Sequence, residues 1–283
     1  MCNEIMQSNT ASALLGTQQR PFGIAVSGLS LEQCTSCDIN QLKQWLGQHG
    51  VAVIKGAFAH IGIDDQAARD DVFVRFLARL GPMTFTQGET PVEQQPLLNR
   101  VSNVGRITPP KSVFHTDTSY VADPPAYTAL RAVSLPSQGG DTVFSDQYLA
   151  YETLPQVVKE RLAGVKVLHQ VSGLTAESLA SAQPDSLQNW HLLFKVHPLS
   201  GRKAIFLSTP QRCREMTGFP DEYSQKIVRI LYQHSTRYYR AKHHKWQVDD
   251  LLIWDNRCTM HRGDHAAVVG DRVFHRGMVL ASS

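Results

Sequence analysis

Turn-forming residues divide this chain into short apolar runs, and this pattern limits the folds that it can adopt. Runs such as YTALRAVSL and TVFSD are rich in β-branched and aromatic residues, which favour strands. A series of short strands separated by Gly/Pro turns is typical of an all-β sandwich or barrel core, in which paired sheets protect the strand edges. We expect strands at 51–56, 127–135, 142–146, 165–170, 192–197, 203–208, 250–255 and 272–281.

Four further segments show the spacing of helices. Asp38 is expected to cap the first helix, which Gly50 ends, and Gly81 stops the second. The remaining two helices are expected at about 147–163 and 221–236. Apolar residues recur on one face of the first, second and fourth helices, at Ile39, Leu42, Trp45 and Leu46, at Phe73, Phe76, Leu77 and Leu80, and at Tyr223, Ile227, Ile230 and Leu231.

The size and charge of the chain exclude several classes of function. With 283 residues, 42% of them hydrophobic and 19% charged, the chain can bury a sizeable core. Its net charge of +3 is spread without a Lys/Arg block, so we expect a small anionic ligand and no nucleic acid. No apolar run approaches the length of a membrane span or signal peptide, so we expect no membrane partner and a cytoplasmic location.

No internal repeat or linker divides the sequence. We therefore expect a flexible N-terminus over 1–20 and a single domain over 21–283. The segment 172–189 has weak periodicity and lies between two expected strands, so it is either a lid-like insertion or a plain surface loop.

Five cysteines are an odd number in a chain of this length, so we do not expect a secreted disulfide framework. Cys34 and Cys37 form a CxxC pair, but no second pair follows to complete a structural zinc site. We expect ordinary reduced thiols.

Three residues have the chemistry of metal ligands. His115 and Asp117 lie one residue apart, so on extended backbone their side chains point to the same face. His261 follows a second expected strand. An HxD pair alone is a weak signal, because it occurs by chance. Two histidines and one carboxylate, however, form a facial triad that leaves adjacent positions open, as non-haem Fe(II) oxygenases require.

The last expected strand, RVFHRGMVLA, carries two arginines on one face. Arg272 and Arg276 alternate with His275, which should face the other side. Guanidinium groups that point inward are costly unless they meet anions, so two inward arginines predict two anionic groups. The alternative is that both point outward into solvent.

Other residues near the motifs receive structural interpretations. We expect His197 to be structural, and His243 and His244 to be solvated in a basic loop. Trp254 and Asn256 are expected to shape the loop that presents His261.

Five ordered motifs resemble the TauD/TfdA family of Fe(II)/2-oxoglutarate-dependent dioxygenases, which includes taurine dioxygenase and 2,4-dichlorophenoxyacetate dioxygenase. They are FHTDTSY, SLPSQGGDTVFSD, HPLSGRKAIFLS, WDNRCTMHRGD and RVFHRGMVL, and the resemblance runs from about residue 20 to the end. It implies a mainly β fold with flanking helices: a double-stranded β-helix, also called a jelly roll or cupin-like fold.

The resemblance also implies roles for individual residues. His115, Asp117 and His261 match the iron ligands. Thr142 and Arg272 match the residues that bind 2-oxoglutarate, and Arg276 matches the position that holds the anionic group of the prime substrate. Family members are often dimers or tetramers, so an assembly of identical chains is compatible with the resemblance.

The sequence departs from taurine dioxygenase in its substrate contacts. Thr86, Glu89 and Lys111 stand where that enzyme has a histidine, a tyrosine and an asparagine in contact with taurine. We therefore do not expect a taurine specialist, and Lys111 is expected to attract an anion. Because Asp117 fills the carboxylate position of the iron site, halogenation is disfavoured.

The expected activity is the hydroxylation of a small carboxylate, sulfonate or sulfate, with Fe(II), 2-oxoglutarate and O2, and with release of succinate and CO2. The same iron site could instead catalyse desaturation or cyclisation in specialised metabolism. A non-catalytic protein that binds 2-oxoglutarate or metal, and a zinc hydrolase, are the alternatives from other classes.

Overall fold

The structure, a computed structural model, describes residues 21–86, 89–106, 112–171, 187–237 and 241–281. Lys111, the N-terminal segment 1–20 and most of the expected lid, 172–186, lie outside these residues. No helix in the described ranges is long and apolar enough to cross a membrane.

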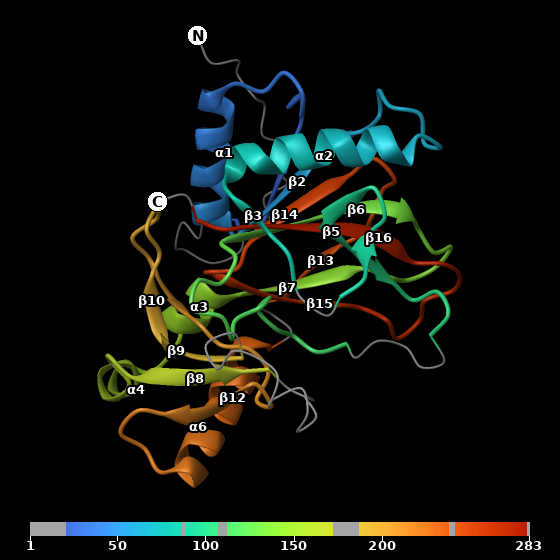
Figure 1. Cartoon of the computed structure of the whole chain (residues 1–283). Coiled ribbons are helices and arrows are strands. Elements are labelled where there is room, and N and C mark those ends of the chain that lie inside the picture. Colours follow the sequence, from blue (N-terminus) through green and yellow to red (C-terminus); the bar gives the residue numbers. More distant parts are fainter. Residues whose placement is uncertain (1–20, 87–88, 107–111, 172–186, 238–240, 282–283) are drawn as a thin grey trace.

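An eight-stranded sheet forms the centre of the molecule (Figure 1). Its order is β1-β2-β14-β6-β16-β5-β4, and β3 also pairs with β16. Only the β1–β2 pair is parallel. The strands are β1 (Ile24–Val26), β2 (Val51–Ile54), β3 (Met83–Thr84), β4 (Pro91–Val92), β5 (Gln95–Ser102), β6 (Tyr127–Ser134), β14 (Leu251–Asp255) and β16 (Val273–Val279).

A smaller sheet packs against the inner face of the large one. Its order is β13-β7-β15, from Ala241–His244, Thr142–Asp146 and Thr259–Gly263. Phe144 from the small sheet packs with Trp254 and Phe274 from the large sheet. This two-sheet arrangement is the jelly roll expected from the sequence, so the fold-class prediction is confirmed.

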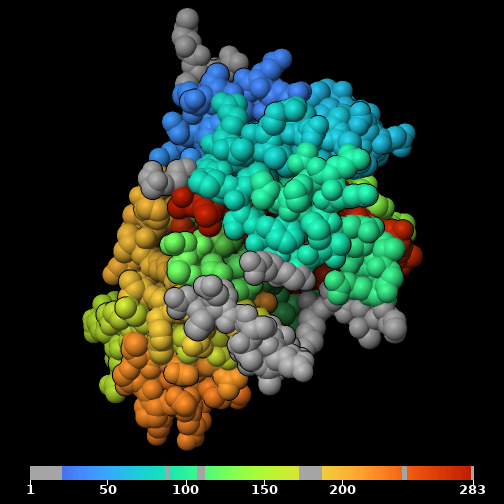
Figure 2. All heavy atoms as spheres, in the orientation of Figure 1, coloured from blue at the N-terminus to red at the C-terminus, as the bar shows by residue number. Residues whose placement is uncertain are grey.

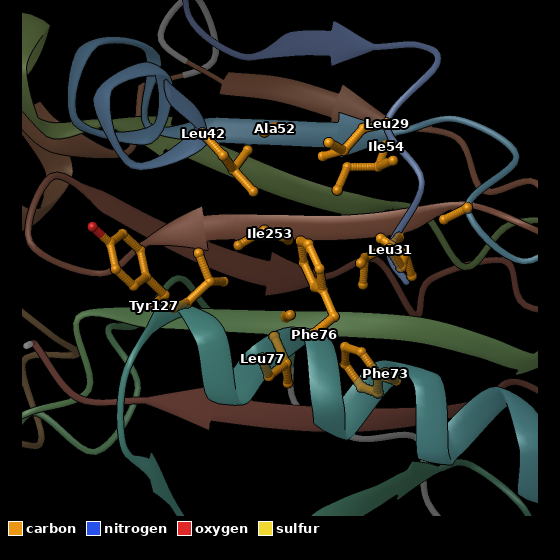
Figure 3. Close-up of a cluster of buried hydrophobic side chains, with 14 of the residues drawn as sticks. Leu29, Leu31, Leu42, Ala52, Ile54, Phe73, Phe76, Leu77, Tyr127 and Ile253 are labelled. Atoms are coloured by element: carbon orange, nitrogen blue, oxygen red, sulfur yellow. The ribbon is translucent and has the colours of Figure 1, made fainter. Parts of the chain in front are cut away.

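Two helices cover the outer face of the large sheet: α1 (Ser36–His49) and α2 (Gln66–Leu80). Figure 3 shows Leu42 of α1 and Phe73, Phe76 and Leu77 of α2 packed over the strands around Ile253. The N-cap of α1 is Thr35, not Asp38 as expected. The carboxylate of Asp38 instead accepts from the backbone N–H of Thr35, which completes a capping box.

A further layer lies below the two sheets in Figures 1 and 2 and contains short strands and helices. Its strands form a sheet of order β12-β8-β9 and the hairpin β10-β11. The expected helix over 147–163 is in fact two short helices, because Pro155 begins the second one. The elements are α3 (Gln147–Glu152), α4 (Gln156–Arg161), β8 (Lys166–Gln170), β9 (Gln188–Leu192), β10 (Phe194–Val196), β11 (Lys203–Ile205), β12 (Cys213–Met216) and α6 (Asp221–Ser235).

Two expectations about side chains are wrong. The AKHHKW segment contains strand β13, and His244 is buried there instead of being solvated, because the strand pairs with β7. Cys37 is disulfide-bonded, whereas Cys34, Cys213 and Cys258 are the reduced thiols that we expected.

Candidate metal centre

Two backbone hydrogen bonds bring the expected metal ligands together. The N–H of His115 donates to the carbonyl of His261 and the N–H of His261 donates to that of His115, both at 2.9 Å. The segment around His115 therefore lies alongside β15, which carries His261. Thr118 has a φ of 44°, so the chain turns immediately after Asp117.

The three ligand groups face one another, with Asp117 and His261 buried and His115 partly exposed. Oδ1 of Asp117 lies 3.6 Å from Nε2 of His115, and Oδ2 lies 3.7 Å from Nε2 of His261. One potential ligand atom from each residue lies within 4.8 Å of the other two. Such a separation suits a single cation placed between them.

The protonation states of the ligands fit a metal. Nδ1 of His115 lies 3.1 Å from the carbonyl oxygen of Val113, so the proton belongs on Nδ1 and the lone pair of Nε2 faces Asp117. Burial lowers the pKa of His261 to about 3, so this imidazole is neutral at neutral pH. Burial alone would raise the pKa of Asp117, but His261, His115 and Arg276 outweigh it and hold this pKa below its usual range. An ionised Asp117 carboxylate and a neutral His261 imidazole are the ionisation states that a metal requires.

A chain of buried hydrogen bonds orients the Asp117 carboxylate. The Thr128 hydroxyl donates to Oδ2 of Asp117 at 2.9 Å and accepts from the Asn256 amide at 2.8 Å. The indole of Trp254 donates to the Asn256 carbonyl oxygen at 3.1 Å, and its ring lies 4.5 Å from that of His261. The supporting roles expected for Trp254 and Asn256 are consistent with these contacts. Thr128 was missed, because nothing in its strand-like surroundings sets it apart.

Arg272 and Thr142 meet at the other end of the pocket. Nη2 of Arg272 lies 3.5 Å from the Thr142 hydroxyl, and Nε donates to the carbonyl of Gly140 at 3.0 Å. Arg272 is 3% exposed and forms no ion pair within the described ranges. Burial lowers its pKa to about 10, against the opposing effect of Asp141. A desolvated guanidinium in this setting favours an anionic ligand.

Trp246 contacts the same two residues as Arg272, Thr142 and Phe274, and no sequence pattern predicted this role. Its indole N–H donates to the Thr142 hydroxyl at 3.0 Å. Its ring packs at 4.5 Å from that of Phe274, and the guanidinium of Arg272 lies 4.3 Å from the same Phe274 ring. Trp246 therefore holds both Thr142 and the residue between the two arginines.

Arg276 of β16 lies beside the candidate metal ligands. Its Nη1 is 3.5 Å from Oδ1 of Asp117, and its Nη2 contacts Glu89. His275 faces the other side of the strand, as expected, where Nδ1 lies 2.8 Å from Oδ1 of Asp70 on α2. Arg272 and Arg276 thus both point inward, Arg272 beside Thr142 and Arg276 beside Asp117.

A second cluster of potential ligands has a structural explanation. His197, Asp255 and Cys258 are buried close together. Both oxygens of Asp255 are already occupied, because Arg257 donates to each of them and Nε2 of His197 lies 3.0 Å from Oδ2. The structural role expected for His197 is consistent with this pairing.

A jelly roll that brings two histidines and one carboxylate together defines a class of protein, the mononuclear non-haem metal oxygenases. Residues 14–278 match the family described as "Taurine catabolism dioxygenase TauD, TfdA family". The chain belongs to this family. It is therefore an oxidoreductase, a dioxygenase that depends on Fe(II), 2-oxoglutarate and O2.

Individual relatives support this assignment. The alpha-ketoglutarate-dependent 2,4-dichlorophenoxyacetate dioxygenase of Cupriavidus pinatubonensis is 26% identical over 285 residues, which cover 92% of this chain and 94% of that protein. The alpha-ketoglutarate-dependent sulfate ester dioxygenase of Pseudomonas putida is 29% identical over 52% of each chain.

Solved structures share the fold. A taurine dioxygenase from Burkholderia xenovorans has a TM-score of 0.75 at 24% identity and covers 93% of this chain and 87% of its own. AAD-2, solved with Mn(II) and N-oxalylglycine, has the same TM-score and identity and covers 94% of this chain and 96% of its own.

Proposed function

We propose that this enzyme hydroxylates a small molecule bearing a carboxylate, sulfonate or sulfate group and releases succinate and CO2. Fe(II) would be held by His115, Asp117 and His261, and 2-oxoglutarate by Thr142 and Arg272. The bound metal and cosubstrate would supply the activation of O2 that cleavage of an unactivated C–H bond requires. Relatives that act on 2,4-dichlorophenoxyacetate and on sulfate esters support this substrate class.

The observation that carries this proposal is the buried Arg272, which lies beside Thr142 and has no carboxylate partner in the described part of the chain. A planar guanidinium can bind a carboxylate through two charge-assisted hydrogen bonds. Arg272 directly precedes β16 and Arg276 lies within it, so four residues at an extended rise of about 3.3 Å per residue separate their backbones by about 13 Å. This separation leaves room for a dicarboxylate at Arg272 and a second anion at Arg276.

Different residues would bind 2-oxoglutarate and the prime substrate. Arg272 and Thr142 would fix the distal carboxylate of 2-oxoglutarate, and Trp246 would keep the Thr142 hydroxyl in place. Arg276 would orient the prime substrate beside the metal, since its guanidinium lies next to Asp117. Nε of Arg276 and Nδ2 of Asn99 are buried without an acceptor among the described residues, which supports an oxygen-rich ligand there. Lys111 is kept as a proposed contact for the same anion.

An anaerobic titration with Fe(II) and 2-oxoglutarate tests the cosubstrate site. The wild type should develop the weak visible charge-transfer band of a chelated keto acid, and His115→Ala should not. Arg272→Gln should weaken 2-oxoglutarate binding roughly tenfold to hundredfold, because a charge-assisted pair is lost. The matched control is Arg100→Gln, which alters an exposed arginine of β5. A folded, iron-loaded wild type without the band would contradict the proposal.

The cytoplasmic location and any assembly of identical chains stay predictions from the sequence. Size-exclusion chromatography with light scattering would measure the second directly.

A further inference from the structure

Glu89 forms an ion pair with Arg276, the residue proposed to bind the anionic group of the prime substrate. Its Oε2 accepts from Nη2 of Arg276. The Arg276 side chain is 11% exposed, whereas that of Glu89 is 38% exposed. Glu89 lies in the connection between β3 and β4 and is therefore not held by strand pairing. A mostly buried cation is thus paired with a carboxylate that has access to solvent.

The other contacts of Arg276 are with groups that cannot leave as easily. Asp117, 3.5 Å from Nη1, belongs to the metal site and is buried and held by Thr128. The Thr86 hydroxyl and the Asn99 carbonyl oxygen are neutral acceptors, each 3.4 Å from Nη2. Glu89 is therefore the charged partner of Arg276 that an incoming anion can replace.

Two carboxylates and an incoming anion cannot share one guanidinium without strong repulsion, because like charges at contact distance repel strongly in a poorly hydrated pocket. Binding an anion at Arg276 therefore requires Glu89 to move toward solvent. Two buried donors can form hydrogen bonds with the incoming anion, because Nε of Arg276 and Nδ2 of Asn99 have no acceptor in the described ranges.

We propose that Glu89 is an internal competitor for the anion site of Arg276, which pairs with the guanidinium in the substrate-free enzyme and is displaced by the anionic group of the prime substrate. This inference rests on the proposed function. Its consequence is selectivity: simple monoanions bind weakly because they must displace Glu89, whereas a substrate with further contacts in the pocket can do so. Glu89 is then a specificity-determining residue.

Calorimetric titration with two monoanionic probes tests this inference. The probes are propane-1-sulfonate and 2,4-dichlorophenoxyacetate, added to the full chain loaded with Mn(II) and 2-oxoglutarate. Glu89→Gln keeps the size of the side chain and removes its charge, so it should bind at least one probe about tenfold more tightly than the wild type, the equivalent of one partly exposed charge-assisted contact. Glu89→Ala should change affinity in the same direction.

Two further variants locate the effect. Glu93→Gln removes an exposed charge in the turn between β4 and β5, and it should bind the probes as the wild type does. Arg276→Gln, combined with Glu89→Gln, should abolish the gain, because the gain depends on the freed guanidinium.

Several outcomes would overturn the inference. Equal affinity in the wild type and Glu89→Gln would show that Glu89 does not compete. Weaker binding by Glu89→Gln would overturn it as well and would assign Glu89 to a cationic group of the substrate. Failure of both Glu89 variants to bind either probe would show that Arg276 is not an anion site that Glu89 blocks. The charge-transfer band of the Fe(II)-loaded protein separates these failures from a failure of the proposed function, because it reports the cosubstrate site alone.

Discussion

Single residues in this molecule act through partners that are distant in sequence. Thr128 is 11 residues from Asp117 and 128 from Asn256, yet its hydroxyl joins the two side chains. The carboxylate of Asp117 can rotate about its side-chain bonds, and the Thr128 hydrogen bond restricts that rotation. Groups that orient a metal ligand in this way commonly affect metal affinity nearly as much as a ligand does.

Replacing Thr128 with valine should therefore weaken metal binding. We expect a loss of about tenfold to hundredfold in affinity for Fe(II) or Mn(II), because Asp117 loses its buried donor and Asn256 its acceptor. Anaerobic calorimetry measures the change. Thr217→Val, which alters a threonine that accepts from the backbone of Lys166 in the lower layer, is the control and should bind metal as the wild type does. Unchanged affinity in Thr128→Val would contradict the orienting role.

Close packing between a helix and a strand, as well as pairing between strands, sets the positions of the elements. Helix α2 packs against β16, the strand that carries Arg276 and directly follows Arg272. Gly277 of this strand lies directly under the helix, where an added Cβ would overlap Cδ1 of Leu77 and come within 3.2 Å of Cδ2 of Leu98. The absence of a side chain therefore sets the distance between helix and strand.

Gly277→Ala should destabilise the fold by about 1–3 kcal/mol, the usual cost of forcing a methyl group into a packed core. Chemical denaturation measures this free energy of unfolding. In a Leu77→Ala background the same change should cost clearly less, since the overlapping methyl group is gone. Gly62→Ala is the matched control, because a Cβ there meets no atom within 4 Å. Equal costs in both backgrounds would show that the helix contact is not the cause.

The molecule as a whole buries several histidines in neutral form outside the metal site. Burial, and then the charge of Lys195, lower the pKa of His191 to about 4. Burial also lowers the pKa of His244 to about 4, and the charges of Lys55 and Lys242 lower it further. In the unfolded chain these histidines become protonated near pH 6.5, whereas in the folded chain they become protonated only near pH 4. Stability present above pH 6.5 is therefore lost as the pH falls toward 4.

His191→Gln should reduce this acid sensitivity. The loss of unfolding free energy between pH 6.5 and 4 should be smaller in the variant by up to about 2 kcal/mol, after allowance for partial screening by solvent. Urea denaturation at a series of pH values measures the difference. The same slope in His191→Gln would mean that other groups dominate acid unfolding.

Much of the fold follows from local patterns. Period-two alternation and turn residues identified the strands around 127–135, 142–146, 250–255 and 272–281, and helical spacing identified α1 and α2. Helix α6 was also expected, but its face was wrong, because Tyr223 and Ile230 are exposed and Val228 is buried. Several strands were missed, because they are polar, short or interrupted by proline and depend on pairing with a neighbour: β1, β3, β4, β5, β12, β13 and β15.

The sequence by itself determined which residues could supply the chemistry of the candidate site: potential ligands at His115, Asp117 and His261, and two arginines on one face of an expected strand. Those inferences need only the identity of residues and the geometry of a single strand. The tertiary structure alone decided the partners, such as Thr128 with Asp117, Trp246 with Thr142, and Glu89 with Arg276. The reason is physical: hydrogen-bond partners more than a few residues apart depend on strand register and on the packing of the two sheets, which no local pattern encodes.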